Sequence, residues 1–205
     1  RTFLNYDYQA SDVTDVSGRG RDGSVNIQGT GTATFTADVP APLAPQHTQS
    51  IRLTDNGTAG AARVERAVAS SELNFNTADW TVSGWFKRAN TSTIDSILQL
   101  GESGGWANNA MRLVMSAGSN TLELRNYAVA VQDVGLSKTN VAAGIWHHYA
   151  IVRSGSTLSF YLNGSLVGSD SAFTLTFDPS RPVKFGGVAS SNLDRWFNGS
   201  LADPA

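Results

Sequence analysis

The sequence predicts an all-β fold, built as a sandwich of two antiparallel sheets. Short runs of alternating apolar and polar residues recur along the chain, and each run ends at a cluster of Gly, Asn, Asp, Ser or Pro. The sequence carries no long amphipathic helical stripe. A chain of 205 residues has the length of one sandwich domain, so we expect a single domain over residues 1–205.

Residues 146–167 carry the clearest strand and turn signals. Residues 146–153 favour one strand, which a short Ser-Gly-Ser segment then interrupts. Residues 157–162 alternate with a period of two and favour a second strand. The dipeptide Asn163-Gly164 follows, and both of its residues tolerate the positive φ angles of a tight hairpin turn. We therefore predict a meander of three antiparallel strands, the third starting at Leu166.

The other strands follow from the same alternation, and one segment allows two structures. Residues 61–70 are compatible with a helical turn or, at 62–65, with a strand. Prolines make residues 29–49 a surface loop with a short strand at 34–36. The remaining predicted strands are residues 3–8, 25–27, 50–54, 79–87, 96–100, 110–115, 121–125 and 127–134, and the predicted connections are 136–144 and 169–182.

Several stretches resemble motifs of one known family. Residues 146–164 combine Trp-His-His-Tyr-Ala with a later Tyr-Leu-Asn-Gly, and residues 81–87 read Thr-Val-Ser-Gly-Trp-Phe-Lys. Residues 15–23 begin with an Asp-Val-Ser-Gly turn. Together with residues 183–187 and 196–201, these stretches resemble the LamG-like jelly-roll domains of the concanavalin A-like lectin/glucanase superfamily. The resemblance implies a jelly roll whose closing strands lie at 183–187 and 196–201.

The resemblance also predicts how the domain ends. Family members usually have a further strand with an aromatic residue, whereas this sequence ends at Asp203-Pro204-Ala205. We therefore expect that the domain lacks its last C-terminal strand, either because the chain is truncated or because this strand comes from elsewhere. An open sheet edge at that place would allow self-association with another copy of the chain.

Composition narrows the class of partner. The net charge is −2 and no basic stripe is present, so we expect no nucleic acid partner. The apolar runs are too short for membrane insertion. The chain contains no Cys, which excludes disulfides and Cys-based zinc sites. Sparse Lys and Glu with abundant Ser, Thr, Asn and Gly is typical of exported proteins, and we expect the protein to be secreted or on the cell surface.

The acidic residues argue against an enzyme. Glycosidases use a pair of carboxylates facing one cleft. None of the glutamates has a second carboxylate two or four residues away on the same strand. The glutamates are Glu65, Glu72, Glu102 and Glu123. His147 and His148 are adjacent on a predicted strand, so they point to opposite faces and cannot jointly bind one metal ion. We therefore predict no catalytic residues.

A structural Ca²⁺ ion is the expected cofactor. The resemblance implies such an ion in many members, with an acidic ligand just after the closing motif. That position is Ala202 here, and Asp203 is the next residue. Loop carboxylates of the N-terminal segment are the other predicted ligands. They are Asp7, Asp15 and Asp22, for which the alternative is a role in capping turns.

Aromatic side chains are the predicted ligand-binding residues. Trp85 and Tyr161 fall on the polar faces of their strands, where a ring can stack on a sugar. The other candidates are Tyr149, Trp106 in a Gly-rich loop, and Trp196. The same alternation assigns Trp80, Phe86, Phe160 and Leu162 to the core.

These patterns together predict a non-catalytic recognition or adhesion module of a larger exported protein, which binds a glycan or a protein surface. The competing interpretation is an architectural, self-assembling domain of a surface or appendage protein. A glycoside hydrolase ranks third, because the carboxylate pair is missing.

Overall fold

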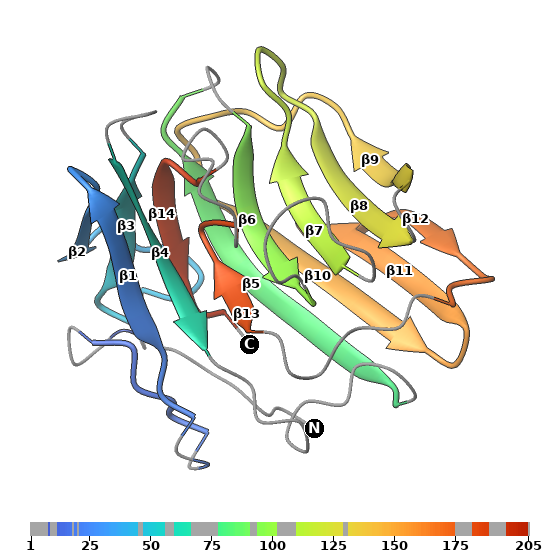
Figure 1. Ribbon diagram of the computed structural model, residues 1–205, viewed down its shortest axis with the longest axis horizontal. Coiled ribbons are helices and arrows are strands. Elements are labelled where there is room, and N and C mark those ends of the chain that lie inside the picture. The colour runs from blue at the N-terminus through green and yellow to red at the C-terminus, as the bar shows by residue number, and fades with distance from the viewer. Residues whose placement is uncertain are drawn as a thin grey trace.

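The structure is a computed structural model, and it is an all-β sandwich. Two antiparallel sheets of seven strands each lie one behind the other (Figure 1). The residues that the structure describes are 8, 12–17, 19, 21–44, 47–55, 60–66, 78–90, 94–101, 110–128, 131–174, 182–188 and 196–204. The alternating runs of the sequence therefore become strands, and the fold class predicted from them is confirmed.

The first sheet, called the β1–β9 sheet, has the strand order β1-β4-β13-β6-β7-β8-β9. Its strands are β1 (Ser24–Gly29), β4 (Gly60–Arg66), β13 (Val183–Phe185), β6 (Asp95–Leu100), β7 (Ala110–Met115), β8 (Leu122–Ala128) and β9 (Val131–Lys138). The second, called the β2–β12 sheet, has the order β12-β11-β10-β5-β14-β3-β2. Its strands are β2 (Thr32–Thr36), β3 (Ser50–Thr54), β14 (Gly199–Ala202), β5 (Trp80–Arg88), β10 (His147–Ser154), β11 (Thr157–Leu162) and β12 (Ser165–Asp170).

The hydrophobic core lies between the two sheets. Strand β11 buries every second residue, and β5 does the same, which leaves the intervening residues on the outer face. Burying one large apolar side chain contributes about 1.5 to 3 kcal/mol. The residues assigned to the core from their alternation are all buried, namely Trp80, Phe86, Phe160 and Leu162.

The turn between β11 and β12 forms as its sequence predicts. Asn163 and Gly164 have φ angles of 51° and 78°, the left-handed values that a two-residue hairpin requires. The Asn163 side chain fastens this turn to β10, because its Oδ1 accepts a hydrogen bond of 2.9 Å from the His148 backbone N–H. Strands β10, β11 and β12 are thus the predicted meander.

Strand β14 forms within the closing segment expected at 196–201. It lies inside the β2–β12 sheet and pairs with β3 on one side and β5 on the other. The outermost strands are β12 and β2 in this sheet and β1 and β9 in the other.

Several expected segments differ in the structure. Of the two structures allowed for residues 61–70, the strand forms, because β4 pairs with β1 and β13 on either side. The strand expected at 127–134 is wrong, since β8 ends at Ala128 and β9 begins at Val131. Part of the expected connection at 136–144 belongs to β9, where pairing with β8 outweighs weak local alternation. The strand expected at 3–8 lies outside the described residues except for Tyr8.

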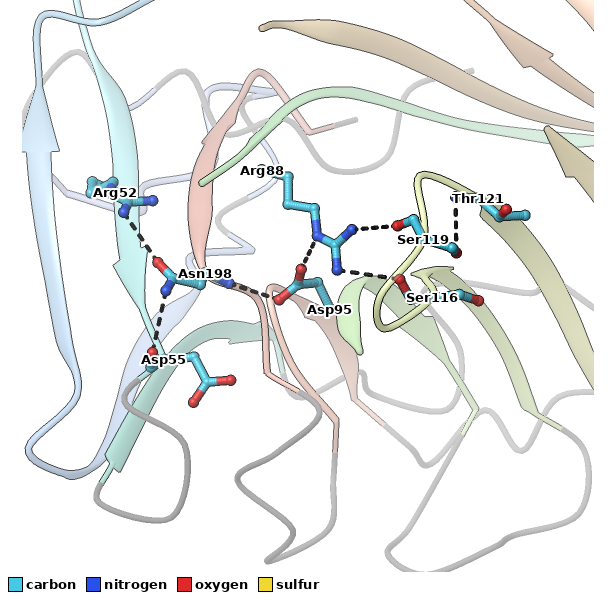
Figure 2. Close-up of polar contacts among 8 residues, drawn as sticks. All are labelled: Arg52, Asp55, Arg88, Asp95, Ser116, Ser119, Thr121 and Asn198. Atoms are coloured by element: carbon cyan, nitrogen blue, oxygen red, sulfur yellow. Dashed lines mark hydrogen bonds and ion pairs between the residues drawn. The ribbon is translucent and has the colours of Figure 1, made fainter. Parts of the chain in front are cut away.

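A buried ion pair ties the two sheets together at one rim of the sandwich. Arg88 of β5 and Asp95 of β6 form the pair, and their side chains are 1% and 0% exposed. The guanidinium also donates to the backbone carbonyls of Ser119, at 3.0 Å, and Ser116, at 3.3 Å (Figure 2). The backbone N–H of Asn198 donates to the other Asp95 oxygen at 3.3 Å. This network joins three segments that are distant in the sequence.

Candidate functional site

The outer face of the β2–β12 sheet carries a pair of stacked rings. His148 of β10 lies directly opposite Trp85 of β5. Their ring centroids are 5.0 Å apart and their planes are tilted by 57°. Both side chains are partly exposed, because alternation directs them away from the core. The pair forms a partly apolar surface on an otherwise polar face.

Tyr161 lies on the same face, two strands away from Trp85. Ala150 of β10 is paired with Tyr161 on one side and with Ser83 of β5 on the other. Strand spacing and rise place the Cα atoms of Tyr161 and Trp85 about 12 Å apart. The small residues Ala150 and Ser83 thus lie between the larger rings of Tyr161 and Trp85. We call Trp85, His148, Tyr161, Ala150 and Ser83 the aromatic platform.

Polar groups of small size border the platform. Ser159 of β11 and Ser169 of β12 share a hydrogen bond of 3.0 Å between their hydroxyls. Partial burial lowers the pKa of His148, because desolvation disfavours the charged imidazolium. The platform is therefore suited to an uncharged ligand that presents both an apolar face and hydroxyl groups.

The neighbouring histidine supports the platform from the core side. His147 is 6% exposed, and its Nε2 lies 3.0 Å from the carbonyl of Ala142. A carbonyl only accepts, so Nε2 donates, and Nδ1 accepts from the amide of Asn163 at 3.1 Å. The two histidines point to opposite faces, as predicted. His147 helps to hold the turn that follows Tyr161.

A contact around Asp38 limits the platform on one side. The Asp38 carboxylate pairs with Lys87 at 2.5 Å and accepts from the Trp146 indole at 3.2 Å. The Asp38 carbonyl accepts from the Ser50 hydroxyl at 2.6 Å. Ser50 and Ala202 are 0% and 2% exposed although both lie on the outer side of the sheet. The exposed part of this face is therefore the region of β5, β10, β11 and β12.

The five predicted ligand-binding aromatic residues differ in whether their rings are exposed. Trp85 and Tyr161 lie together on the outer face, but Tyr149 is buried under the same sheet and is 1% exposed. Trp196 is 0% exposed and packs under the guanidinium of Arg63, at 4.4 Å from the ring centroid. The expectation that Tyr149 and Trp196 offer their rings to a ligand is wrong, because neighbouring side chains cover both. Trp106 lies outside the described residues.

Two of the carboxylates expected to bind Ca²⁺, Asp15 and Asp22, accept hydrogen bonds within a turn. Asp15 accepts from the backbone N–H groups of Ser17, at 3.0 Å, and Arg21, at 3.1 Å. Asp22 accepts from the backbone N–H of Asp15 at 2.9 Å. In the part of the chain that the structure covers, no three His, Asp or Glu side chains form a metal-binding group. Asp15 and Asp22 thus have the turn-capping contacts that the sequence allowed as the alternative.

The two remaining acidic candidates are Asp203 and Asp7. Asp203 has a positive φ of 46° and lies close enough to Tyr149 for its charge to act there. Burial, with the charge of Asp203 as the smaller cause, raises the pKa of the Tyr149 phenol far above its usual range. Asp7 lies outside the described residues. Calcium stays a prediction.

Each glutamate that the structure describes is held by an arginine on its own strand. Glu65 pairs with Arg63 at 2.9 Å, and Glu123 pairs with Arg125 at 2.6 Å. These ion pairs engage both carboxylates, whereas a glycosidase needs two carboxylates that face one cleft. Glu72 and Glu102 lie outside the described residues.

Two antiparallel sheets with this strand order define a jelly roll of the lectin type. Residues 56–205 match the family model described as the concanavalin A-like lectin/glucanases superfamily. The chain belongs to this superfamily, which confirms the resemblance found in its motifs. No curated protein sequence matches the chain.

Solved structures with the same fold include several binding domains. Domain 4 of the extracellular arabinanase AbnA from Geobacillus stearothermophilus, in complex with arabinotriose, has a TM-score of 0.73 at 16% identity, covering 98% of this chain and 89% of that domain. The sialidase CBM40 of Ruminococcus gnavus, bound to α2,3-sialyllactose, has a TM-score of 0.56 at 14% identity, with 76% and 87% covered. A botulinum neurotoxin DC binding domain has a TM-score of 0.64 at 13% identity, and the match covers 98% of this chain but 46% of that domain.

Within the described part of the chain, no helix has the length and apolar character needed to cross a membrane.

Two contacts between distant strands could not be predicted from the sequence. Alternation gave the face of His148, but its contact with Trp85 depends on the register between β10 and β5. On the other sheet, Arg112 of β7 lies directly opposite Arg125 of β8, and the sequence did not predict this pairing either.

Proposed function

We propose that this domain is a non-catalytic glycan-binding module of a larger exported protein. The observation that carries this proposal is the aromatic platform, which places Trp85 and Tyr161 on one exposed face with the small residues Ala150 and Ser83 between them. The fold is that of domains solved with arabinotriose and with α2,3-sialyllactose. These likenesses support the class of ligand, and the platform supports the place where it binds.

The platform would hold a sugar by stacking and by peripheral hydrogen bonds. An aromatic ring contributes about 0.5 to 1.5 kcal/mol beyond area burial when it stacks well. The separation of about 12 Å between Trp85 and Tyr161 suits a chain of two or three sugar units, given the strand spacing. Hydroxyls of Ser83 and Ser159 lie at the floor and border of the platform, where they can orient the sugar.

The experiment is a binding screen of the whole chain against neutral and acidic oligosaccharides, including arabinotriose. Hits are measured again by calorimetry with the variants Trp85→Ala and Tyr161→Ala. We expect each variant to weaken binding of a neutral ligand by about tenfold or more, since each removes a stacking ring. Ile27→Ala is the matched control, because Ile27 is 53% exposed on the other sheet. Unchanged binding in both aromatic variants would refute the platform.

A protein partner is the second candidate for the same face. Leu166 is 57% exposed and lies directly opposite Tyr161 on β12. An exposed leucine beside an aromatic ring favours a protein contact more than a sugar contact. A related botulinum toxin binding domain has been solved in complex with synaptotagmin II. The variant Leu166→Ser distinguishes a protein partner from a glycan ligand, because it should weaken a protein complex and leave sugar binding unchanged.

A further inference from the structure

The aromatic platform has a covered side next to Trp85. On β14, the residue directly opposite Trp85 is Ala202, and the residue opposite Lys87 is Ser200. Directly opposite residues of an antiparallel pair share a face, so both lie on the outer side of the β2–β12 sheet. Their side chains are small, yet they are only 2% and 3% exposed. A ligand that follows the line from Tyr161 to Trp85 therefore meets covered residues at the next strand, about 5 Å beyond Trp85.

Asp38 stands above this covered strip. Its backbone carbonyl accepts from the Ser50 hydroxyl of β3 at 2.6 Å, which places Asp38 over the outer face. Its carboxylate contacts the ammonium of Lys87 on β5 at 2.5 Å and the indole N–H of Trp146, just before β10, at 3.2 Å. The contacts of this one residue thus reach from β3, across β14, to β5 and the start of β10. Asp38 therefore forms a barrier along the β14 side of the platform.

The opposite side of the platform is exposed. Tyr161 lies on β11, and the next strand, β12, is the outermost strand of the sheet (Figure 1). Leu166 lies directly opposite Tyr161 and is 57% exposed, and Ser169 of the same strand is exposed as well. A chain that stacks on Tyr161 can therefore continue past the edge of the sheet. The platform is open at β12 and closed at β14.

The closed end offers polar groups as well as a barrier. The side chains of Lys87 and Asp38 remain 26% and 44% exposed, so a ligand can reach both. An ammonium donates hydrogen bonds and a carboxylate accepts them, and a hydroxyl group can do both. The terminal unit of a glycan has a free hydroxyl where an interior unit has its glycosidic bond. A chain end is therefore the part of a glycan that fits the closed end.

We propose that the aromatic platform binds the end of a glycan chain. The terminal unit lies on Trp85 against Asp38 and Lys87, and the rest of the chain runs over Tyr161 and past β12. This inference rests on the proposed function and adds which part of the glycan is bound. An interior segment does not fit, because its continuation beyond Trp85 would meet the barrier at Asp38. Asp38 is thus a specificity-determining residue of the site.

The test counts how many molecules of the whole chain bind to one polysaccharide chain. Calorimetry compares arabinotriose with linear arabinan, and maltotriose with amylose. We expect one bound molecule for each polymer chain, whatever its length, because each chain has one matching end. The Kd per bound molecule should lie within about threefold of that for the trisaccharide. Several bound molecules on each polymer chain would reveal binding to chain interiors and would overturn the inference.

A variant tests the barrier residue. Asp38→Ala should weaken trisaccharide binding by about tenfold, since it removes a hydrogen-bond partner of the terminal hydroxyl. Asp38→Asn should bind within about threefold of the parent, because its amide oxygen still accepts. The unfolding midpoint of both should change little, since the pair with Lys87 is exposed. Asp12→Ala is the matched control, because Asp12 is an exposed carboxylate that bonds within its own turn to Thr14.

The possible failures are distinguishable. If a trisaccharide binds and its polymer takes up several molecules per chain, this inference fails and the proposed function stands. The same holds if Asp38→Ala binds the trisaccharide as tightly as the parent does. If neither trisaccharide and neither polymer binds, the inference fails. If the wider oligosaccharide screen is also negative, the proposed function fails with it.

Discussion

The ring of Trp85 lies against the imidazole of His148, with 5.0 Å between their centroids. The two residues are 63 positions apart in the sequence, since 148 − 85 = 63, and the register of β5 with β10 brings them together. Packing of this kind fixes the orientation of Trp85 and removes water from His148. The same contact therefore shapes the aromatic platform and sets how it responds to pH.

The first prediction concerns this pH response. Folding lowers the pKa of His148, so as the pH falls the unfolded chain takes up a proton before the folded chain does. The free energy of unfolding should therefore decrease as the pH falls below the unfolded-state value of about 6.5, and should level off below the folded-state pKa. Urea unfolding at pH 7.5 and 5.5 measures this loss. In His148→Gln the loss should shrink, and an undiminished loss would assign it to other groups.

The second prediction concerns the ion pair at the rim. Arg88 and Asp95 are almost fully buried, and removing one partner leaves an uncompensated charge. Asp95→Asn should lower the free energy of unfolding by about 3 to 5 kcal/mol, as measured by urea titration. Lys87→Met is the matched control, because its pair with Asp38 is 26% and 44% exposed and should be worth less than about 1 kcal/mol. Equal losses in the two variants would contradict the role of Arg88 and Asp95.

The third prediction concerns a close approach inside the core. A Cβ atom at Gly84 would lie 3.0 Å from the Tyr149 hydroxyl and 3.2 Å from its ring. Gly84→Ala should therefore displace a buried ring and lower the free energy of unfolding by about 1 to 3 kcal/mol. Ser83→Ala on the outer face should change it by less than about 0.5 kcal/mol. Near-ultraviolet circular dichroism would report the ring movement, and an unaltered spectrum would count against it.

The fourth prediction separates turn capping from calcium binding. Asp15 accepts from the backbone N–H of Ser17 and Arg21 and from the Ser17 hydroxyl at 2.7 Å. Asp15→Ala should lower the free energy of unfolding by about 1 to 3 kcal/mol, with or without added Ca²⁺. The thermal midpoint of the parent chain, measured with and without a chelator, tests the ion directly. A midpoint that falls on chelation and recovers with Ca²⁺ would restore the calcium expectation.

Local signals in the sequence were sufficient for the strands and for the central meander. Alternation over 157–162 placed Phe160 in the core, and Asn163-Gly164 formed the predicted turn because both residues adopt positive φ at low cost. Such features depend on neighbours within a few residues. For that reason they can be read without knowing which strands pair.

The sequence by itself determined the fold class, the core face of each clear strand and the polar side of Trp85 and Tyr161. Tertiary structure alone decided that Tyr149 and Trp196 are covered, that His148 meets Trp85 and that Arg112 faces Arg125. Period-two alternation assigns a side chain to a face but does not say what lies over that face. Register between distant strands and the packing of the two sheets supply this information, because they depend on contacts across the whole chain.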